Sequence, residues 1–325
     1  MTTAHASLAR RARLPVVALV LLSSAGAGAW LFWPRGQERV SLSAGTGARV
    51  VAVSPDGALI AAAGDTGAVR VWAAGATASR FTLDGHTGKV SGLAFAPDSK
   101  TLASCGEDRT VRLWDVTTGA PGAVVPASEA AVLCVAFAPD GKTLASAGSD
   151  HLVSLWTAAG KPVRVLKGHT RRVHALAFAP DGKTLASAGE DGGVRLWNWQ
   201  TGTPTGQLSV EKHRVHALAV SADGKVLAAA ATGGPRWWNL SDRSERPKVA
   251  AVGGARAVAV DRDGTLLATG HEDGSVKLWG ADGSEVKALS GHRGPVFGAG
   301  FTPDGKTLVT ASGDGTVKLW DVPAK

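Results

Sequence analysis

The chain has 325 residues, of which 42 are glycine and 15 are proline, and 44% are hydrophobic. A chain of this length and composition can bury a sizeable core, which excludes the collagen-like and disordered classes. Without Arg10, Arg11, Arg13 and Arg35 the formal net charge falls from +8 to +4, because 35 Lys and Arg less these four leave 31 against 27 Asp and Glu. General nucleic-acid binding is therefore not indicated.

The N-terminal part divides into a basic segment, residues 1–13, the uncharged 20-residue stretch Leu14–Trp33 and a linker, residues 34–37. A helix of this length rises about 30 Å and can cross a bilayer. The run Ala25-Gly-Ala27 also resembles the cleavage site of a secretory signal peptide. We favour an uncleaved anchor, because cleavage would leave the rings of residues 30–33 in water, whereas an anchor places them at the membrane interface.

The arginines upstream of this stretch predict that the N-terminus stays in the cytoplasm. We therefore expect a single-pass, membrane-anchored protein whose remaining chain is extracytoplasmic. Export after signal cleavage is the alternative.

Seven tryptophans recur between residues 38 and 325 with spacings of 42, 42, 41, 41, 41 and 41 residues: Trp72, Trp114, Trp156, Trp197, Trp238, Trp279 and Trp320. A turn built on aspartate, such as Ala-Pro-Asp181-Gly, precedes each of them and lies between two apolar runs. A second turn, such as 189–192, leads to the strand that bears the tryptophan, and a weaker strand such as 162–166 follows. Each repeat is thus predicted to contain four short strands.

These repeats resemble those of the WD-repeat β-propeller family, whose blades carry Gly-His near the start and Trp-Asp near the end. Three Gly-His pairs end 28 residues before a repeat tryptophan, at His86, His169 and His292, and Asp115 and Asp321 complete two Trp-Asp pairs. The resemblance implies an all-β fold, a seven-bladed β-propeller of four-stranded antiparallel blades over residues 38–325. The last repeat lacks a fourth strand, so we expect residues 38–42 to supply it and close the ring.

The resemblance also implies a structural hydrogen-bond network in each complete blade. Its members are the Gly-His histidine, a Ser or Thr on the second strand, the aspartate of the turn between the second and third strands, and the tryptophan. Three sets are complete: His86, Ser104, Asp108 and Trp114; His169, Ser187, Asp191 and Trp197; His292, Thr310, Asp314 and Trp320. Three-fold repetition without a nucleophile elbow favours a structural role over a hydrolase triad. The fifth repeat departs most from the pattern, because residues 232–235, Thr-Gly-Gly-Pro, replace the second turn and its network aspartate.

In the family, two connections of each blade open on the face where partners usually bind. They are the loop that enters the first strand and the turn between the second and third strands, which bears the aspartate of the network. Seven equivalent positions just inside the first strands form a ring on this face: Arg49, Ser91, Leu133, His174, His216, Arg256 and Phe297. Nearby loops add Arg171, Arg172, Lys212, His213 and Arg214, so blades 4 to 6 present a basic arc. The candidate partner-binding face comprises Arg49, Arg171, Arg172, His174, Arg214, His216, Arg256 and Phe297. Asp65, Glu107, Glu190 and Glu272 dilute its charge, so an ordinary mixed-charge rim is the alternative.

The sequence contains no phosphate loop, metal-ligand spacing or paired-carboxylate motif, so we expect no catalysis, no cofactor and no metal site. The expected function is a membrane-tethered scaffold that binds a protein or peptide. An extracytoplasmic propeller that binds a small molecule or metal in its channel, with or without catalysis, is the alternative. Trp199 and Trp237 are expected to pack in the core, as are Cys105 and Cys134, for which a disulfide is left open.

Overall fold

The computed structural model describes residues 38–210, 213–249 and 253–324. The predicted anchor, Leu14–Trp33, lies outside these residues, and so does Lys212 of the predicted basic arc. Within the described residues no helix is long and apolar enough to cross a membrane.

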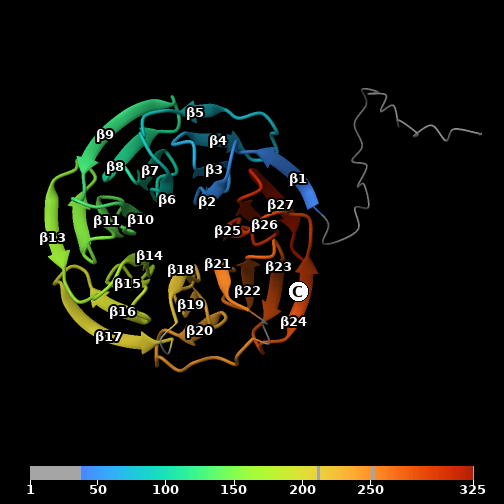
Figure 1. Ribbon diagram of the computed structural model, residues 1–325. Coiled ribbons are helices and arrows are strands. Elements are labelled where there is room, and N and C mark those ends of the chain that lie inside the picture. The colour runs from blue at the N-terminus through green and yellow to red at the C-terminus, as the bar shows by residue number, and fades with distance from the viewer. Residues whose placement is uncertain (1–37, 211–212, 250–252, 325) are drawn as a thin grey trace, which may run out of the picture. The chain divides into compact units, whose positions relative to one another are not determined.

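Seven antiparallel sheets surround a channel, so this part of the chain is a seven-bladed β-propeller (Figure 1). Blade 1 contains β2 (Ala48–Val53), β3 (Leu59–Gly64), β4 (Val69–Ala73) and β5 (Phe81–Leu83). Blade 2 contains β6 (Val90–Phe95), β7 (Thr101–Gly106), β8 (Thr110–Asp115) and β9 (Ala120–Pro126). Blade 3 contains β10 (Val132–Phe137), β11 (Thr143–Gly148), β12 (Val153–Thr157) and β13 (Pro162–Leu166).

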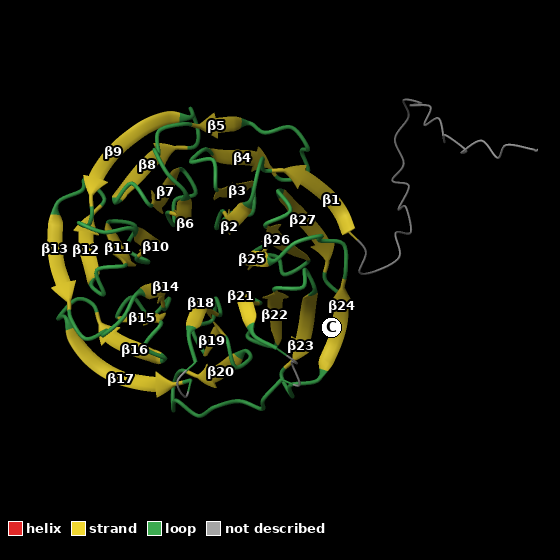
Figure 2. Cartoon of the chain, in the orientation of Figure 1, coloured by secondary structure: helices red, strands yellow, loops and turns green. Residues whose placement is uncertain are grey.

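The other blades repeat this order from the channel outwards (Figure 2). Blade 4 contains β14 (Val173–Phe178), β15 (Thr184–Gly189), β16 (Gly193–Asn198) and β17 (Thr203–Ser209). Blade 5 contains β18 (Val215–Val220), β19 (Val226–Ala231) and β20 (Arg236–Asn239). Blade 6 contains β21 (Ala255–Val260), β22 (Leu266–His271), β23 (Val276–Gly280) and β24 (Glu285–Leu289). Blade 7 contains β25 (Val296–Phe301), β26 (Thr307–Ser312), β27 (Thr316–Asp321) and β1 (Glu38–Ser43).

The core of the propeller lies between the blades. Buried apolar side chains of the described residues form clusters, one between each pair of neighbouring blades. The second strands β11 and β19 are buried along their whole length, because a neighbouring blade covers each of their faces. Trp199 and Trp237 are buried in these layers, and Cys105 and Cys134 are buried, unbridged thiols.

The outer strand of blade 7 comes from the other end of the propeller sequence. β1 pairs antiparallel with β27, from Ser43 opposite Thr316 to Glu38 opposite Trp320. Leu42 is buried in the cluster between blades 7 and 1. Since Glu38 lies at the end of the blade opposite the Asp314 turn, the chain enters the propeller on the face opposite the candidate partner-binding face.

Blade 5 corrects the expectation of four strands in every blade, because its sheet has three. A fourth strand begins where Trp238 pairs with Glu245 and the Arg246 N–H donates to the Trp237 carbonyl, 2.9 Å between nitrogen and oxygen. Pro247 follows and has no N–H with which to continue the ladder. The Trp237 indole N–H instead donates to the Pro247 carbonyl at 2.8 Å.

Candidate functional site

The four predicted network residues lie together in blades 2, 4 and 7. In blade 2 the Trp114 indole N–H donates to Ser104 Oγ at 2.8 Å, and Ser104 Oγ lies 2.7 Å from His86 Nε2. His86 Nδ1 lies 2.8 Å from Asp108 Oδ2. Blade 4 has the same contacts at 2.8, 2.7 and 2.9 Å, and blade 7 has them at 2.8, 2.8 and 3.1 Å. These chains of contacts join the second and third strands, and the turn between them, to the loop that enters each blade.

The directions of these hydrogen bonds follow from the tryptophan, which is a donor only, and from the charge of the histidine. Ser104 Oγ accepts from Trp114, and Asp108 accepts from His86 Nδ1–H. Burial lowers the pKa of His86, against the effect of Asp108, so the imidazole is neutral and its Nε2 accepts the hydrogen of Ser104 Oγ. In blade 7 burial favours a higher pKa of Asp314, but hydrogen bonds from Thr316 and the Arg293 N–H lower it to about 2.

Acid is expected to destabilise the propeller in two steps. Burial lowers the pKa of six histidines, to about 4 for His216, so below about pH 6.5 the unfolded chain binds protons that the folded one does not. Each unit of such a shift is worth about 1.4 kcal/mol. The urea midpoint should stay level from pH 8.5 to 7.5, fall from pH 6.5 to about 4 as the unfolded chain takes up protons on its histidines, and fall further below pH 4 as Asp314 and its equivalents gain protons. A level midpoint from pH 7.5 to 5 would contradict these assignments, and His216→Gln should make the first step smaller.

Blades 3 and 6 lack the Gly-His histidine and form related hydrogen bonds with other residues. In blade 3, Ser128 stands at the histidine position and donates to Asp150 at 2.7 Å, while Ser146 accepts from the Trp156 indole at 2.9 Å. In blade 6 the imidazole comes from the second strand itself, because His271 Nε2 lies 2.8 Å from Thr269 Oγ1, which accepts from Trp279.

Sequence comparison of the repeats did not assign His271, because most sister blades have glycine or another small residue at its position. Its one sequence signal is the combination of a missing Gly-His histidine in blade 6 and an unassigned histidine two residues after the strand threonine. The His271 Nδ1–H donates to the Gly254 carbonyl at 3.3 Å. Burial lowers the pKa of His271, so this imidazole is also neutral in its network.

The candidate partner-binding face surrounds the mouth of the channel. A cavity of about 190 Å³ lies there, lined by all seven first strands and by six of the seven predicted ring positions, Arg49, Ser91, Leu133, His174, His216 and Phe297. The ring has two unlike sides, because Ser91 and Leu133 of blades 2 and 3 are uncharged, whereas blades 4 to 6 contribute His174, His216 and Arg256. Phe297 packs against the Arg49 guanidinium, 5.0 Å from its ring centre.

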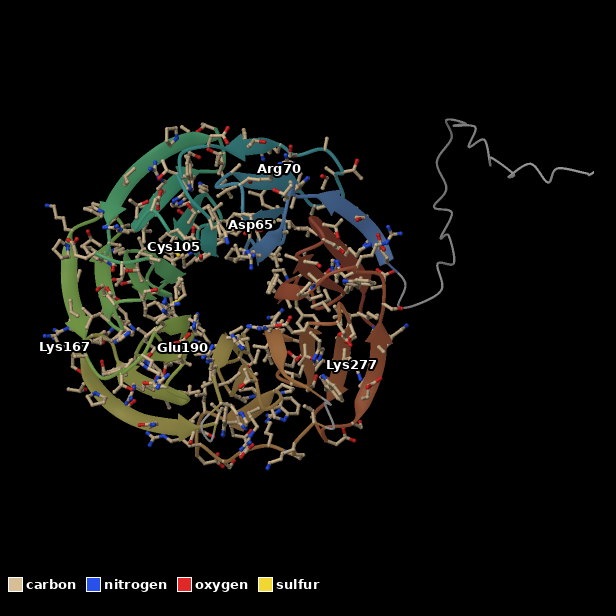
Figure 3. All side chains as sticks on the ribbon, in the orientation of Figure 1. Asp65, Arg70, Cys105, Lys167, Glu190 and Lys277 are labelled. Atoms are coloured by element: carbon tan, nitrogen blue, oxygen red, sulfur yellow. The ribbon has the colours of Figure 1, made fainter. Side chains whose placement is uncertain are left out.

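Acidic neighbours neutralise the two arginines of the ring. Arg49 Nε lies 2.6 Å from Asp65 Oδ1, and Arg256 forms an ion pair with Glu272. Figure 3 shows Asp65 and Glu190 on the channel side of blades 1 and 4. His174 Nε2 lies 3.4 Å from Glu190, so the dilution of charge predicted for this face is built from specific pairs.

His216 is the ring residue that links the channel mouth to a second cavity. This cavity, of about 360 Å³, lies between blades 5 and 6 and is lined by His216, Arg256 and His271 among others. An Arg256 guanidinium nitrogen lies 3.4 Å from the His216 ring. Burial and then the Arg256 charge lower the pKa of His216 to about 4, so a neutral imidazole faces both cavities at neutral pH.

The remaining predicted residues lie outside the ring. Arg171, Arg172 and Arg214 are exposed on the loops that enter blades 4 and 5, where Arg214 lies 4.0 Å from Glu190. His213 lies outside the ring on the loop that enters blade 5 and is 3.5 Å from Thr232. Among the described residues, no three His, Cys, Asp or Glu side chains are grouped closely enough to hold a metal ion.

Comparison with known families agrees with this geometry. Residues 131–325 match the family described as the IFT122 first beta-propeller, and residues 37–73 and 78–115 match the WD domain, G-beta repeat. No curated protein is similar to the chain over its sequence. The matched segments together include strands of all seven blades.

Proposed function

This chain belongs to the WD-repeat β-propeller family, and we propose that it is a non-catalytic scaffold that binds a partner protein or peptide at the mouth of its channel. Propellers of this family typically bind protein partners and generally act without catalysis. In this chain the repeated Ser, His and Asp side chains are used in the blade networks, which leaves the loops of the mouth as the variable surface.

The observation that carries the proposal is the asymmetry of the ring. On the side of blades 4 to 6, His174, His216 and Arg256 lie next to one another, and two cavities meet at His216. A partner loop across the mouth would find imidazole and guanidinium donors there and a recess of about 360 Å³ for one side chain. The side of blades 2 and 3 offers neither.

The size of the channel cavity favours a partner protein over a small molecule. Its volume of about 190 Å³ is smaller than the ~300–1,000 Å³ of typical ligand pockets.

We further propose that the propeller is tethered to a membrane through Leu14–Trp33 and lies outside the cytoplasm. The support is the 20-residue uncharged stretch with basic residues before it. The first described residue, Glu38, begins β1 on the face opposite the channel mouth described above.

Changing His174, His216 and Arg256 together to alanine is expected to abolish partner capture. The full chain, carrying a C-terminal affinity tag, would be recovered from solubilised membranes and its bound proteins identified by mass spectrometry. The matched control is Ser91→Ala with Leu133→Ala, which alters the same ring on its uncharged side and should keep the same partners.

Two outcomes would contradict the proposal. Unchanged partners in the triple variant would exclude this side of the mouth, and a bound cofactor or metal in the purified protein would support a channel ligand instead. The recovered chain also tests the tether, because an N-terminal sequence starting at Gly28 or Trp30 would show signal cleavage.

A further inference from the structure

The outer rim of blade 3 carries an excess of positive charge. No acidic residue occurs between Asp150 and Asp181, whereas this stretch contains five bases: Lys161, Arg164, Lys167, Arg171 and Arg172. The first three lie on β13 or directly beside it and are exposed. Figure 3 shows Lys167 at the outer rim of the propeller. No described acidic side chain forms an ion pair with Lys161, Arg164 or Lys167, in contrast to the arginines of the channel mouth.

The same rim exposes apolar side chains. Val163 and Val165 of β13 are 52% and 48% exposed, and Val124 of the neighbouring β9 is 51% exposed. Val124 and Val165 occupy equivalent positions in their blades, opposite Arg112 and Ser154. Three of the four large apolar side chains that are exposed in the described residues therefore lie on the outer strands of blades 2 and 3.

β13 is an edge strand that another strand can pair with. It is hydrogen-bonded to β12 alone, so alternate N–H and C=O groups of its other edge face solvent. Proline does not distinguish β13 from β9 and β17, because Pro162 stands opposite Trp156 as Pro121 and Pro204 stand opposite Trp114 and Trp197. What distinguishes β13 is its charge: Glu38 of β1 and Glu285 of β24 pair with lysines of the neighbouring strands, whereas the bases of β13 and its ends have no acidic partner among the described residues.

We propose that β13 is a second docking surface, which takes an extended partner segment with alternating acidic and apolar residues as a fifth strand of blade 3. This surface lies on the outer rim and is independent of the channel mouth. Another copy of the same strand would bring like charges opposite one another, so the surface disfavours self-association and favours an acidic partner.

The order of side chains along β13 gives the partner's pattern. A bulge lies between Pro162 and Arg164, so regular alternation holds only after it, where Val165 and Lys167 share one face. Val163 and Lys161 lie on the other side of Arg164 in the chain and are exposed. Arg164 lies on the face opposite Val165, beside the Gly202 turn of blade 4. A segment that pairs residue for residue with residues 161–167 has acidic residues opposite Lys161, Arg164 and Lys167, at its first, fourth and seventh positions, and apolar residues opposite Val163 and Val165, at its third and fifth.

Binding of a fluorescent peptide to the full chain tests the proposal. The probe, acetyl-Glu-Thr-Val-Glu-Val-Thr-Glu-amide with an attached fluorophore, is expected to bind in anisotropy titrations. A peptide of the same composition, Val-Glu-Thr-Glu-Thr-Glu-Val, and a version of the probe with alternate backbone nitrogens methylated should each bind at least tenfold more weakly. The amides of residues 162–166 should exchange with deuterium at least fivefold more slowly in the complex.

Charge reversal supplies the matched variants. Lys161→Glu with Lys167→Glu should weaken probe binding at least tenfold, and a probe with lysine at its first and seventh positions should bind this variant better than the parent chain. Lys100→Glu with Lys306→Glu makes the same change in net charge at exposed turn lysines and should leave binding unchanged. The proposal is overturned if the probe does not bind, if the rearranged or methylated peptide binds equally well, or if an oligothymidylate binds more tightly than the probe.

Discussion

A chain shortened to begin at Ala48 should lose about 3 kcal/mol or more of unfolding free energy, with a fall in melting temperature on the order of 10 °C. The shortened chain lacks β1, and with it Leu42, which is 2% exposed and packs beside Val317 and Leu319. Truncating one buried leucine to alanine already costs about 2–5 kcal/mol. Here the cavity is accompanied by the unpaired edge of β27 and by loss of the Lys318 partner Glu38.

A chain that begins at Gly36 is the control, because it keeps β1 and should melt as the full chain does. Adding a peptide of residues 36–47 to the shortened chain should restore part of the lost melting temperature by refilling the vacant edge. Equal melting temperatures for the two shortened chains would show that β1 contributes nothing to the closure of the ring.

The architecture of this propeller can be predicted from its sequence because the same local pattern recurs in each blade. Turn chemistry, apolar strands and a tryptophan recur with a period of 41 or 42 residues, and local signals of this kind do not depend on distant contacts. The place of β1 follows from the same logic, since Glu38–Ser43 precedes the first blade as β24 precedes the last one.

Departures from the repeat are harder to predict, because a comparison of repeats aligns positions and not side chains in space. His271 replaces an imidazole that sister blades supply from a loop, and its alignment position gives no hint of that role. The missing strand of blade 5 had a signal in Pro247, whose effect depends on where this residue stands relative to β20. Likewise, the sequence places Asp65 near Arg49 on one face, but the ion pair itself is a result of the fold.

The blade networks contain a matched pair of serines, and their substitution separates packing from hydrogen bonding. Ser187→Ala in blade 4 is expected to cost about 2–4 kcal/mol, because it leaves the Trp197 indole N–H and His169 Nε2 both without their buried partner. Ser146→Ala in blade 3 removes a hydroxyl of the same size from an equally buried site, where only the Trp156 indole N–H loses its acceptor. That change is expected to cost about 1–2 kcal/mol.

Urea unfolding of the two variants at pH 7.5 measures the difference directly, since the lost volume is the same in both. The larger loss for Ser187→Ala depends on a neutral His169 that accepts a hydrogen bond through Nε2, as burial and the lowered pKa of His169 imply. Equal losses would mean that His169 obtains no stability from the serine. The Gly-His histidines would then serve only to hold Asp191 and its equivalents, and the tryptophan bond alone would account for the serine in each blade.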